Sequence, residues 1–120
     1  MNKLIFIVDD NDANLTVAAC ALEDDYRVLT MPSAEKMFSL LEKKRPDLIL
    51  LDIEMPEMTG LEAIVKLKEN TQFSDIPVLF LTGWTDDKLL AQAEKLGALT
   101  VITKQINASV LKENVKKYLE

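Results

Sequence analysis

Short apolar runs alternate with helical patterns along the chain, and this alternation limits the folds that the sequence can adopt. The apolar runs cover residues 4–8, 26–30, 48–51, 76–81 and 99–102. Helical patterns follow them at residues 15–22, 33–45, 61–70, 88–96 and 109–119. A continuous apolar run is typical of a strand that is buried on both faces. Five strand–helix units predict one doubly wound parallel sheet with helices on both faces.

The length of 120 residues suits one domain, and we expect a single domain over residues 1–120. Cys20, the one cysteine, lies in an apolar periodic stretch, which predicts a reduced and buried thiol. No apolar run approaches the roughly 18 residues of a membrane span. The start MNKLIFIVDD does not have the pattern of a signal peptide. The cytoplasm is therefore the expected location.

The charge and the histidine count exclude several classes of function. A net charge of −6 disfavours direct binding of nucleic acid, because neutralisation of phosphates dominates that affinity. The chain contains no histidine. Catalysis by Ser-His or Cys-His pairs, metal binding through imidazole and a role as a phosphohistidine carrier are thereby ruled out.

Polar residues follow four of the five predicted strands. They are Asp9 and Asp10, then Asp52, then Thr82 with Gly83, and finally Thr103 with Lys104. Ligands of open parallel sheets bind outside the carboxyl ends of the strands. We therefore expect Asp9, Asp10, Asp52, Thr82 and Lys104 to surround one pocket.

Three aspartates in one pocket require compensation of their charge. Two carboxylates about 4 Å apart repel each other by roughly 4 kcal/mol at an effective dielectric near 20. Carboxylate oxygens without histidine or cysteine select a hard cation, and Mg²⁺ is favoured because it binds one or two carboxylates together with phosphate oxygens. Lys104 offers a point charge to a phosphate oxygen, and Thr82 offers a hydroxyl donor. This set of residues predicts a site that accepts a phosphoryl group.

These residues also carry a resemblance to a known family. The chain resembles the receiver domain of two-component response regulators over nearly its whole length. The matching features are the pair Asp9-Asp10, the motif Asp52-x-x-Met55-Pro56-x-x-x-Gly60, Thr82-Gly83 and Lys104. The resemblance implies a flavodoxin-like (βα)5 fold with strand order 2-1-3-4-5.

The resemblance further implies the role of each site residue. Asp52 would become an aspartyl phosphate, and Asp10 and Asp52 would bind Mg²⁺ directly with the backbone carbonyl of Glu54. Asp9 would hold the metal through water. Thr82 and Lys104 would bind the phosphoryl oxygens and move on phosphorylation.

The same resemblance implies the partners and the type of activity. A sensor histidine kinase or a histidine-containing phosphotransfer protein would donate the phosphoryl group. The output would pass to a downstream protein or to an effector domain. The domain would assist its own phosphorylation and dephosphorylation without being a turnover enzyme.

Several of these residues also have a purely structural interpretation. Asp9 and Asp10 could cap the first helix, although Asn11 or Asp12 could do so without them. Met55 and Pro56 would shape the loop, and Gly60 would supply a backbone conformation closed to other residues. Trp84, the one tryptophan, would cover the edge of the core, shield the phosphoryl pocket or contact a partner.

Two positions depart from the family pattern. Gln105 follows Lys104, where many receivers have a proline joined by a cis bond. Because a cis bond before a residue other than proline costs about 2.5–4 kcal/mol, we predict a trans Lys104–Gln105 bond and an altered loop. Val101 stands where many receivers have a Tyr or Phe that reports phosphorylation at the surface. This readout would be absent or weakened.

Three other classes of function compete with the receiver interpretation. A Mg²⁺-dependent phosphohydrolase of the haloacid-dehalogenase type would place Asp-x-Asp after the first strand, whereas this chain has adjacent Asp9 and Asp10. A flavodoxin-like FMN module would need a Ser/Thr/Gly-rich phosphate loop there. A degenerate receiver would act only as a binding surface, which Val101 and Gln105 leave open.

Overall fold

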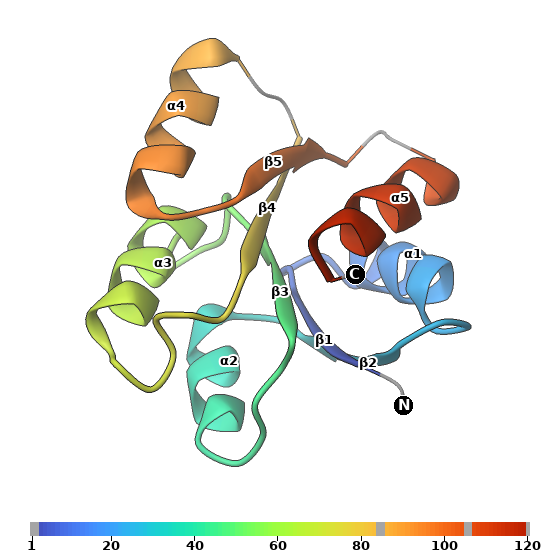
Figure 1. The fold of residues 1–120 in the computed structure, drawn as a ribbon, viewed down its shortest axis with the longest axis horizontal. Helices are drawn as coiled ribbons and strands as arrows, with labels where there is room; N and C mark the ends of the chain where they lie inside the picture. Colours follow the sequence, from blue (N-terminus) through green and yellow to red (C-terminus); the bar gives the residue numbers. More distant parts are fainter. Residues whose placement is uncertain (1–2, 84–85, 105–106, 120) are drawn as a thin grey trace.

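The computed structural model describes residues 3–83, 86–104 and 107–119. Strands and helices alternate through these residues (Figure 1). The strands are β1 (Leu4–Val8), β2 (Arg27–Met31), β3 (Leu48–Asp52), β4 (Val78–Thr82) and β5 (Thr100–Thr103). The helices are α1 (Asp12–Leu22), α2 (Ala34–Leu41), α3 (Gly60–Glu69), α4 (Asp87–Leu96) and α5 (Ala108–Leu119). The predicted alternation is confirmed, with most boundaries displaced by one to three residues.

The five strands form one parallel sheet in the order β2-β1-β3-β4-β5. Helices α1 and α5 cover one face of the sheet, while α2, α3 and α4 cover the other (Figure 1). The predicted fold class and strand order are therefore confirmed. The order reverses between β1 and β3, which places a topological switch point between these two strands.

Successive residues of the inner strands enter two separate hydrophobic layers. In β1, Phe6 packs toward α2 and α3, whereas Ile5 and Ile7 pack toward α1 and α5. All three side chains are fully buried. Side chains alternate across a strand, so a sheet covered on both faces needs apolar residues at consecutive positions. This geometry explains the continuous apolar runs in the sequence.

Residues at the helix ends follow ordinary capping chemistry. Ser33 caps α2 through its hydroxyl, which accepts a hydrogen bond from the backbone N–H of Lys36 at 3.2 Å. Thr59 and Glu62 form a reciprocal capping box at the start of α3. Gly97 ends α4 in the left-handed conformation, with a φ of 110°, which is a common way for a helix to end.

The prediction of a buried Cys20 is wrong. Cys20 lies on α1 but is exposed, whereas Ala18 and Leu22 on the same helix are buried. Each residue advances about 100° around an α-helix, so Cys20 points nearly opposite to its neighbours two positions away. Cys20 belongs to the apolar stretch of the sequence but not to the buried face of helix α1.

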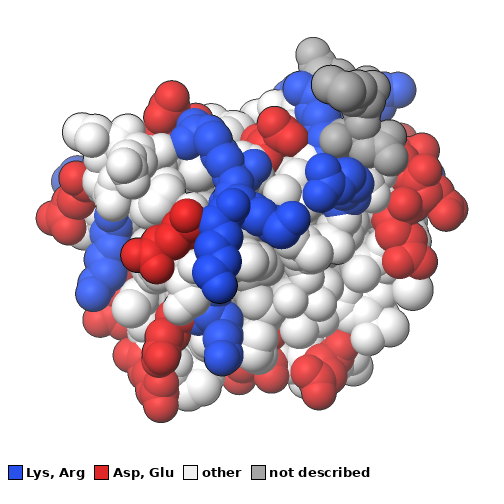
Figure 2. Space-filling view, turned by 90° about the horizontal axis from the view of Figure 1, so that it is seen from below, with Lys and Arg blue, Asp and Glu red and all other residues white. Residues whose placement is uncertain are grey.

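The surface separates some of its charges. Figure 2 views the molecule from the end at which α2 lies, and there Lys and Arg side chains gather across the middle of the face. Asp and Glu side chains lie mostly toward the edges of this face (Figure 2). Among the described residues, no helix has both the length and the apolar character needed to cross a membrane.

Candidate functional site

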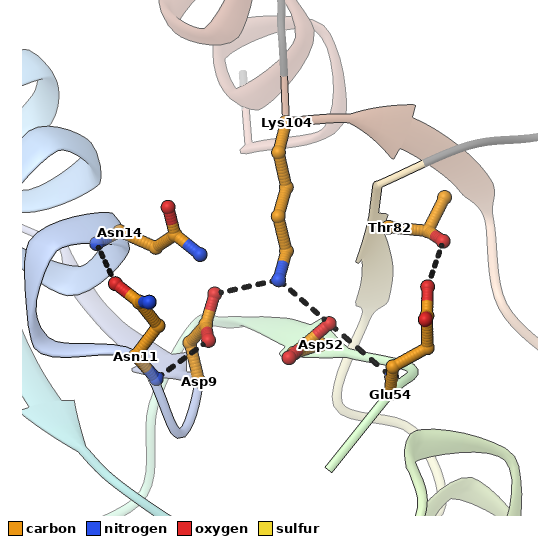
Figure 3. Close-up of polar contacts among 7 residues, drawn as sticks. All are labelled: Asp9, Asn11, Asn14, Asp52, Glu54, Thr82 and Lys104. Atoms are coloured by element: carbon orange, nitrogen blue, oxygen red, sulfur yellow. Dashed lines mark hydrogen bonds and ion pairs between the residues drawn. The ribbon is translucent and has the colours of Figure 1, made fainter.

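The carboxyl ends of β1, β3, β4 and β5 bring the predicted site residues together (Figure 3). Asp52 is the last residue of β3 and pairs in register with Leu81, while Thr82 at the end of β4 pairs with Thr103. Asp9 directly follows β1. Asp9, Asp52 and Thr82 are the buried polar residues of the described chain, each with no more than 1% of its surface exposed. The sheet thus buries three polar side chains at one place.

Lys104 joins two of the aspartates. Its Nζ lies 3.1 Å from Oδ2 of Asp9 and 3.0 Å from Oδ1 of Asp52, and Figure 3 shows the side chain reaching between them. The backbone N–H of Lys104 donates to the carbonyl oxygen of Thr82 at 2.8 Å. This bond continues the pairing of β4 and β5 by one residue, and so it fixes the point from which the lysine side chain extends.

The two carboxylates of Asp52 and Asp9 are only partly satisfied. Oδ1 of Asp52 accepts a hydrogen bond from the backbone N–H of Glu54 at 3.2 Å, in addition to its contact with Lys104. Oδ2 of Asp52 is buried and has no hydrogen-bond partner among the described residues. Oδ1 of Asp9 accepts from the backbone N–H of Asn11 at 2.9 Å, and its Oδ2 has only the ion pair. A buried carboxylate oxygen without a partner is costly and requires an explanation, and an ion or ligand bound at this place would provide one.

The pKa of Asp52 is raised from an ordinary value of 3.8 to about 6, mainly by burial and in smaller part by the negative charge of Asp9. The hydrogen bond and charge of Lys104 act in the opposite direction and hold it down. For Lys104, burial alone would lower the pKa, but the contacts with Asp52 and Asp9 outweigh burial and raise it. The site therefore holds a charged lysine, but this single positive charge does not offset the effect of burial on the ionised form of Asp52.

Three aspartates converge closely enough to share a metal ion. One carboxylate oxygen from each of Asp9, Asp10 and Asp52 lies within 4.8 Å of the others. Asp10 is exposed, whereas the other two are buried, so the cluster opens to solvent on one side. An all-oxygen set with an unpartnered buried atom fits a hard cation such as Mg²⁺, which keeps part of its water shell.

The helix cap next to this cluster is a different residue. Asn11 caps α1, because its side-chain oxygen accepts from the backbone N–H of Asn14 at 3.0 Å. Neither Asp9 nor Asp10 caps the helix. The capping interpretation of this acidic pair therefore does not explain its presence, and both carboxylates are left for the site.

The side chain of Glu54 makes a contact that the sequence did not indicate. The hydroxyl of Thr82 donates to Oε1 of Glu54 at 3.2 Å (Figure 3). The contact depends on how the loop folds after β3, and the spacing of residues in the sequence does not encode it. The resemblance implied a metal-binding role for the backbone carbonyl of Glu54 and an influence of this position on the lifetime of the phosphorylated state, but no partner for its side chain. Its carboxylate instead lies against the threonine expected to bind a phosphoryl oxygen.

Gly60 is required for space rather than for backbone conformation. Among the described residues, Gly97 is the glycine with a positive φ, so the prediction made for Gly60 is wrong. A Cβ on Gly60 would lie 2.3 Å from the carbonyl oxygen of Asp52 and 2.8 Å from Cα of Ile53. The backbone N–H of Gly60 donates to the carbonyl of Ile53 at 2.8 Å. The loop thus returns to the end of β3 so closely that only glycine fits.

A family model of the response regulator receiver domain matches residues 5–116. The chain belongs to this family. Its sequence is 32% identical to the polar-differentiation response regulator DivK of Brucella ovis, over 99% of this chain and 98% of that protein. It is 35% identical to a probable cyclic di-GMP phosphodiesterase of Vibrio cholerae, over 97% of this chain. The chain spans only 26% of the length of that second protein.

Solved structures of receivers have the same fold. The chemotaxis protein CheY4 of Vibrio cholerae superposes with a TM-score of 0.93 at 26% sequence identity, over 99% of this chain and all of that protein. The signal receiver domain of a histidine kinase from Syntrophus aciditrophicus gives a TM-score of 0.87 at 31% identity. That match covers 98% of this chain and 89% of the other.

Of the two departures from the family pattern, the structure describes Val101 but not Gln105. Val101 lies half-buried on β5 and packs against the hydrophobic layer that includes residues of α4. Its small side chain lies at the border of this layer, and a large aromatic side chain is absent there. Gln105, the Lys104–Gln105 bond and Trp84 lie outside the described residues, so the predictions made for them stay predictions.

Proposed function

We propose that this receiver domain accepts a phosphoryl group on Asp52 and passes the signal on by a change of conformation. Receiver domains are phosphorylation-activated signalling switches, and this chain shares their sequence pattern and fold. One observation carries the assignment to Asp52. It is the fully buried carboxylate at the end of the central strand β3, with one oxygen held by Lys104 and Glu54 and the other without a partner.

The transfer step forms one bond and breaks one. The unpartnered oxygen of Asp52 attacks phosphorus, the P–N bond to the imidazole of the partner phosphohistidine breaks, and the imidazole takes the electron pair. Lys104, held 3.0 Å from Asp52, stabilises the negative charge on the transferring group. Asp9, Asp10, Asp52 and the backbone carbonyl of Glu54 would hold Mg²⁺, which would supply further positive charge to the phosphoryl oxygens.

The switch would use Thr82 and Lys104. In this structure the hydroxyl of Thr82 donates to Glu54, and a phosphoryl group on Asp52 would offer a competing acceptor. Lys104 would release Asp9 when a phosphoryl oxygen becomes its partner. Thr82 is the last residue of β4, and Lys104 directly follows β5. These changes of hydrogen-bond and ion-pair partner would therefore shift a pre-existing conformational equilibrium of β5 and the helices beside it.

Receiver domains are phosphoacceptors of signalling pathways rather than enzymes that turn over a substrate. We assign residues 1–120 to one such domain that assists its own phosphorylation and dephosphorylation. Its donor would be a sensor histidine kinase or a histidine-containing phosphotransfer protein. Its output would pass to a protein partner or an effector domain. We expect this transfer to take place in the cytoplasm.

Phosphorylation by a small-molecule donor tests this proposal directly. The protein is incubated with Mg²⁺ and acetyl phosphate, and the intact mass is then measured. We expect a mass gain of one phosphoryl group that requires Mg²⁺ and disappears in Asp52→Asn. Asp24→Asn, which removes an exposed acid away from the site, is the matched control and keeps the adduct. An adduct that survives Asp52→Asn contradicts the assignment.

A further inference from the structure

Helix α2 forms an exposed ridge between two grooves. One groove, with a volume of about 510 Å³, separates α2 from the loop that follows β3 and includes Phe38 in its lining. The other, of about 300 Å³, separates α2 from the end of β2 and includes Leu40. Ser39 borders both grooves and is exposed. The helix therefore presents a narrow ridge to solvent, with a half-buried apolar side chain on each flank.

The ridge carries two rows of opposite charge. Glu35 and Glu42 border the larger groove on one side of Ser39, and Lys36 and Lys43 border the smaller groove on the other side. All four charged side chains are exposed, and none forms an ion pair or a side-chain hydrogen bond within the described part of the chain. Glu35 and Lys36 lie in the first turn of α2, and Glu42 and Lys43 directly follow its last residue, Leu41. Each row thus has one charge near the start of the helix and one just past its end.

We infer that α2 is a contact surface for a second copy of this chain, with the two α2 helices parallel about a two-fold axis. A two-fold axis parallel to the helix exchanges the two sides of the ridge. Each glutamate row then faces the lysine row of the partner, which pairs Glu35 with the partner's Lys36 and Glu42 with the partner's Lys43. An antiparallel arrangement would place glutamates against glutamates, and like charges in contact are unfavourable.

Ser39 allows the two helices to approach. Its small side chain lies at the centre of the ridge, opposite the buried side chains of Met37 and Leu41. The long stems of the charged residues can lie over Phe38 and Leu40 in the grooves, while their charged ends meet those of the partner. Exposed ion pairs are individually weak, so the association is expected only at high protein concentration and low ionic strength.

A charge-swap experiment tests the contact. One variant carries Glu35→Lys and Glu42→Lys, and a second carries Lys36→Glu and Lys43→Glu. Sedimentation equilibrium is measured at low salt from about 10 µM to about 1 mM, a range chosen for a weak interface. We expect the average mass of the unaltered chain to rise with concentration and each variant to stay monomeric. An equimolar mixture of the two variants should associate again, because every facing pair is then complementary.

A matched mixture removes the effect of net charge. Each Glu→Lys change adds two positive charges, so Glu94→Lys with Glu113→Lys reproduces the net charge of the first variant on α4 and α5. Lys95→Glu with Lys116→Glu reproduces that of the second. This control mixture should show no association beyond that of the unaltered chain. An unaltered chain that stays monomeric, or a charge-swapped mixture that behaves like its separate components, overturns the inference. Circular dichroism confirms that each variant is folded, and no step requires phosphorylation.

Discussion

Removing the charge of Asp52 should stabilise the metal-free protein at neutral pH. Asp52 is fully buried, and the pKa of its carboxyl group is raised from 3.8 to about 6 by burial and by the charge of Asp9. The folded state therefore binds a proton more tightly than the unfolded state. Stability from this group is present below about pH 4 and is lost as the pH rises through about 6. The substitution Asp52→Asn removes the titrating group and keeps the shape of the side chain.

The size of the effect follows from the shift. The pKa rises by about two units, and each unit corresponds to about 1.4 kcal/mol, so ionisation of Asp52 costs the folded state about 3 kcal/mol. Lys104 has a raised pKa and stays charged throughout this range of pH. The free energy of unfolding of Asp52→Asn minus that of the unaltered protein should therefore increase by about 3 kcal/mol between about pH 4 and pH 7.5.

Urea unfolding followed by circular dichroism measures this difference in the presence of a chelator. Subtracting the unaltered protein cancels the titration of the shared groups that do not interact with Asp52. Asp24→Asn is the control, because Asp24 is exposed, and its difference from the unaltered protein should not change with pH. A difference for Asp52→Asn that is flat with pH, or that falls as the pH rises, would refute the reasoning about burial.

Three further predictions concern neighbouring parts of the site. Gly60→Ala should lower the free energy of unfolding by roughly 1–3 kcal/mol, since a Cβ would overlap the carbonyl oxygen of Asp52. Gly83→Ala is the control, because the added Cβ would meet open space. Equal urea midpoints for the two variants would contradict the prediction for Gly60. Glu54→Ala removes the acceptor of the hydrogen bond from Thr82. Because that hydrogen bond is worth roughly 1 kcal/mol and competes with the one to a phosphoryl group, its loss should raise the rate of phosphorylation by acetyl phosphate about fivefold. A slower rate would contradict this prediction. Mg²⁺ at about 100 times its dissociation constant should stabilise the protein by about 2.7 kcal/mol, and an equal gain in Asp52→Asn would exclude this carboxylate from the metal site.

The sequence predicted most of the fold because this architecture leaves a clear pattern. The strand Leu48–Asp52 is buried on both faces, so its first four residues are all apolar. A polar residue that directly follows such a strand lies at the ligand-binding edge of the sheet, and this rule predicts that Asp9, Asp52 and Lys104 lie together. Beyond the positions of the strands, this prediction needed only the order of the strands in the sheet and their parallel direction.

Details that depend on the path of a loop were not predictable. The hydrogen bond between Thr82 and Glu54 arises from the loop after β3, and neither its length nor its composition specifies the direction of the Glu54 side chain. Gly60 was recognised as necessary, but the reason is a contact with the backbone of Asp52 that only the folded loop creates. Cys20 was assigned to the core from its apolar neighbours, although one helical position decides its exposure.

The central claim is that Asp52 is the residue that receives the phosphoryl group, and chemical trapping locates that group most directly. The protein is phosphorylated with acetyl phosphate and Mg²⁺ and then treated with borohydride, which reduces an acyl phosphate to an alcohol. Peptide mass spectrometry should find homoserine in place of Asp52, only in the phosphorylated sample, while Asp9 and Asp10 stay unchanged. Homoserine at Asp9 or Asp10, or a phosphorylated protein with an unreduced Asp52, would contradict the claim.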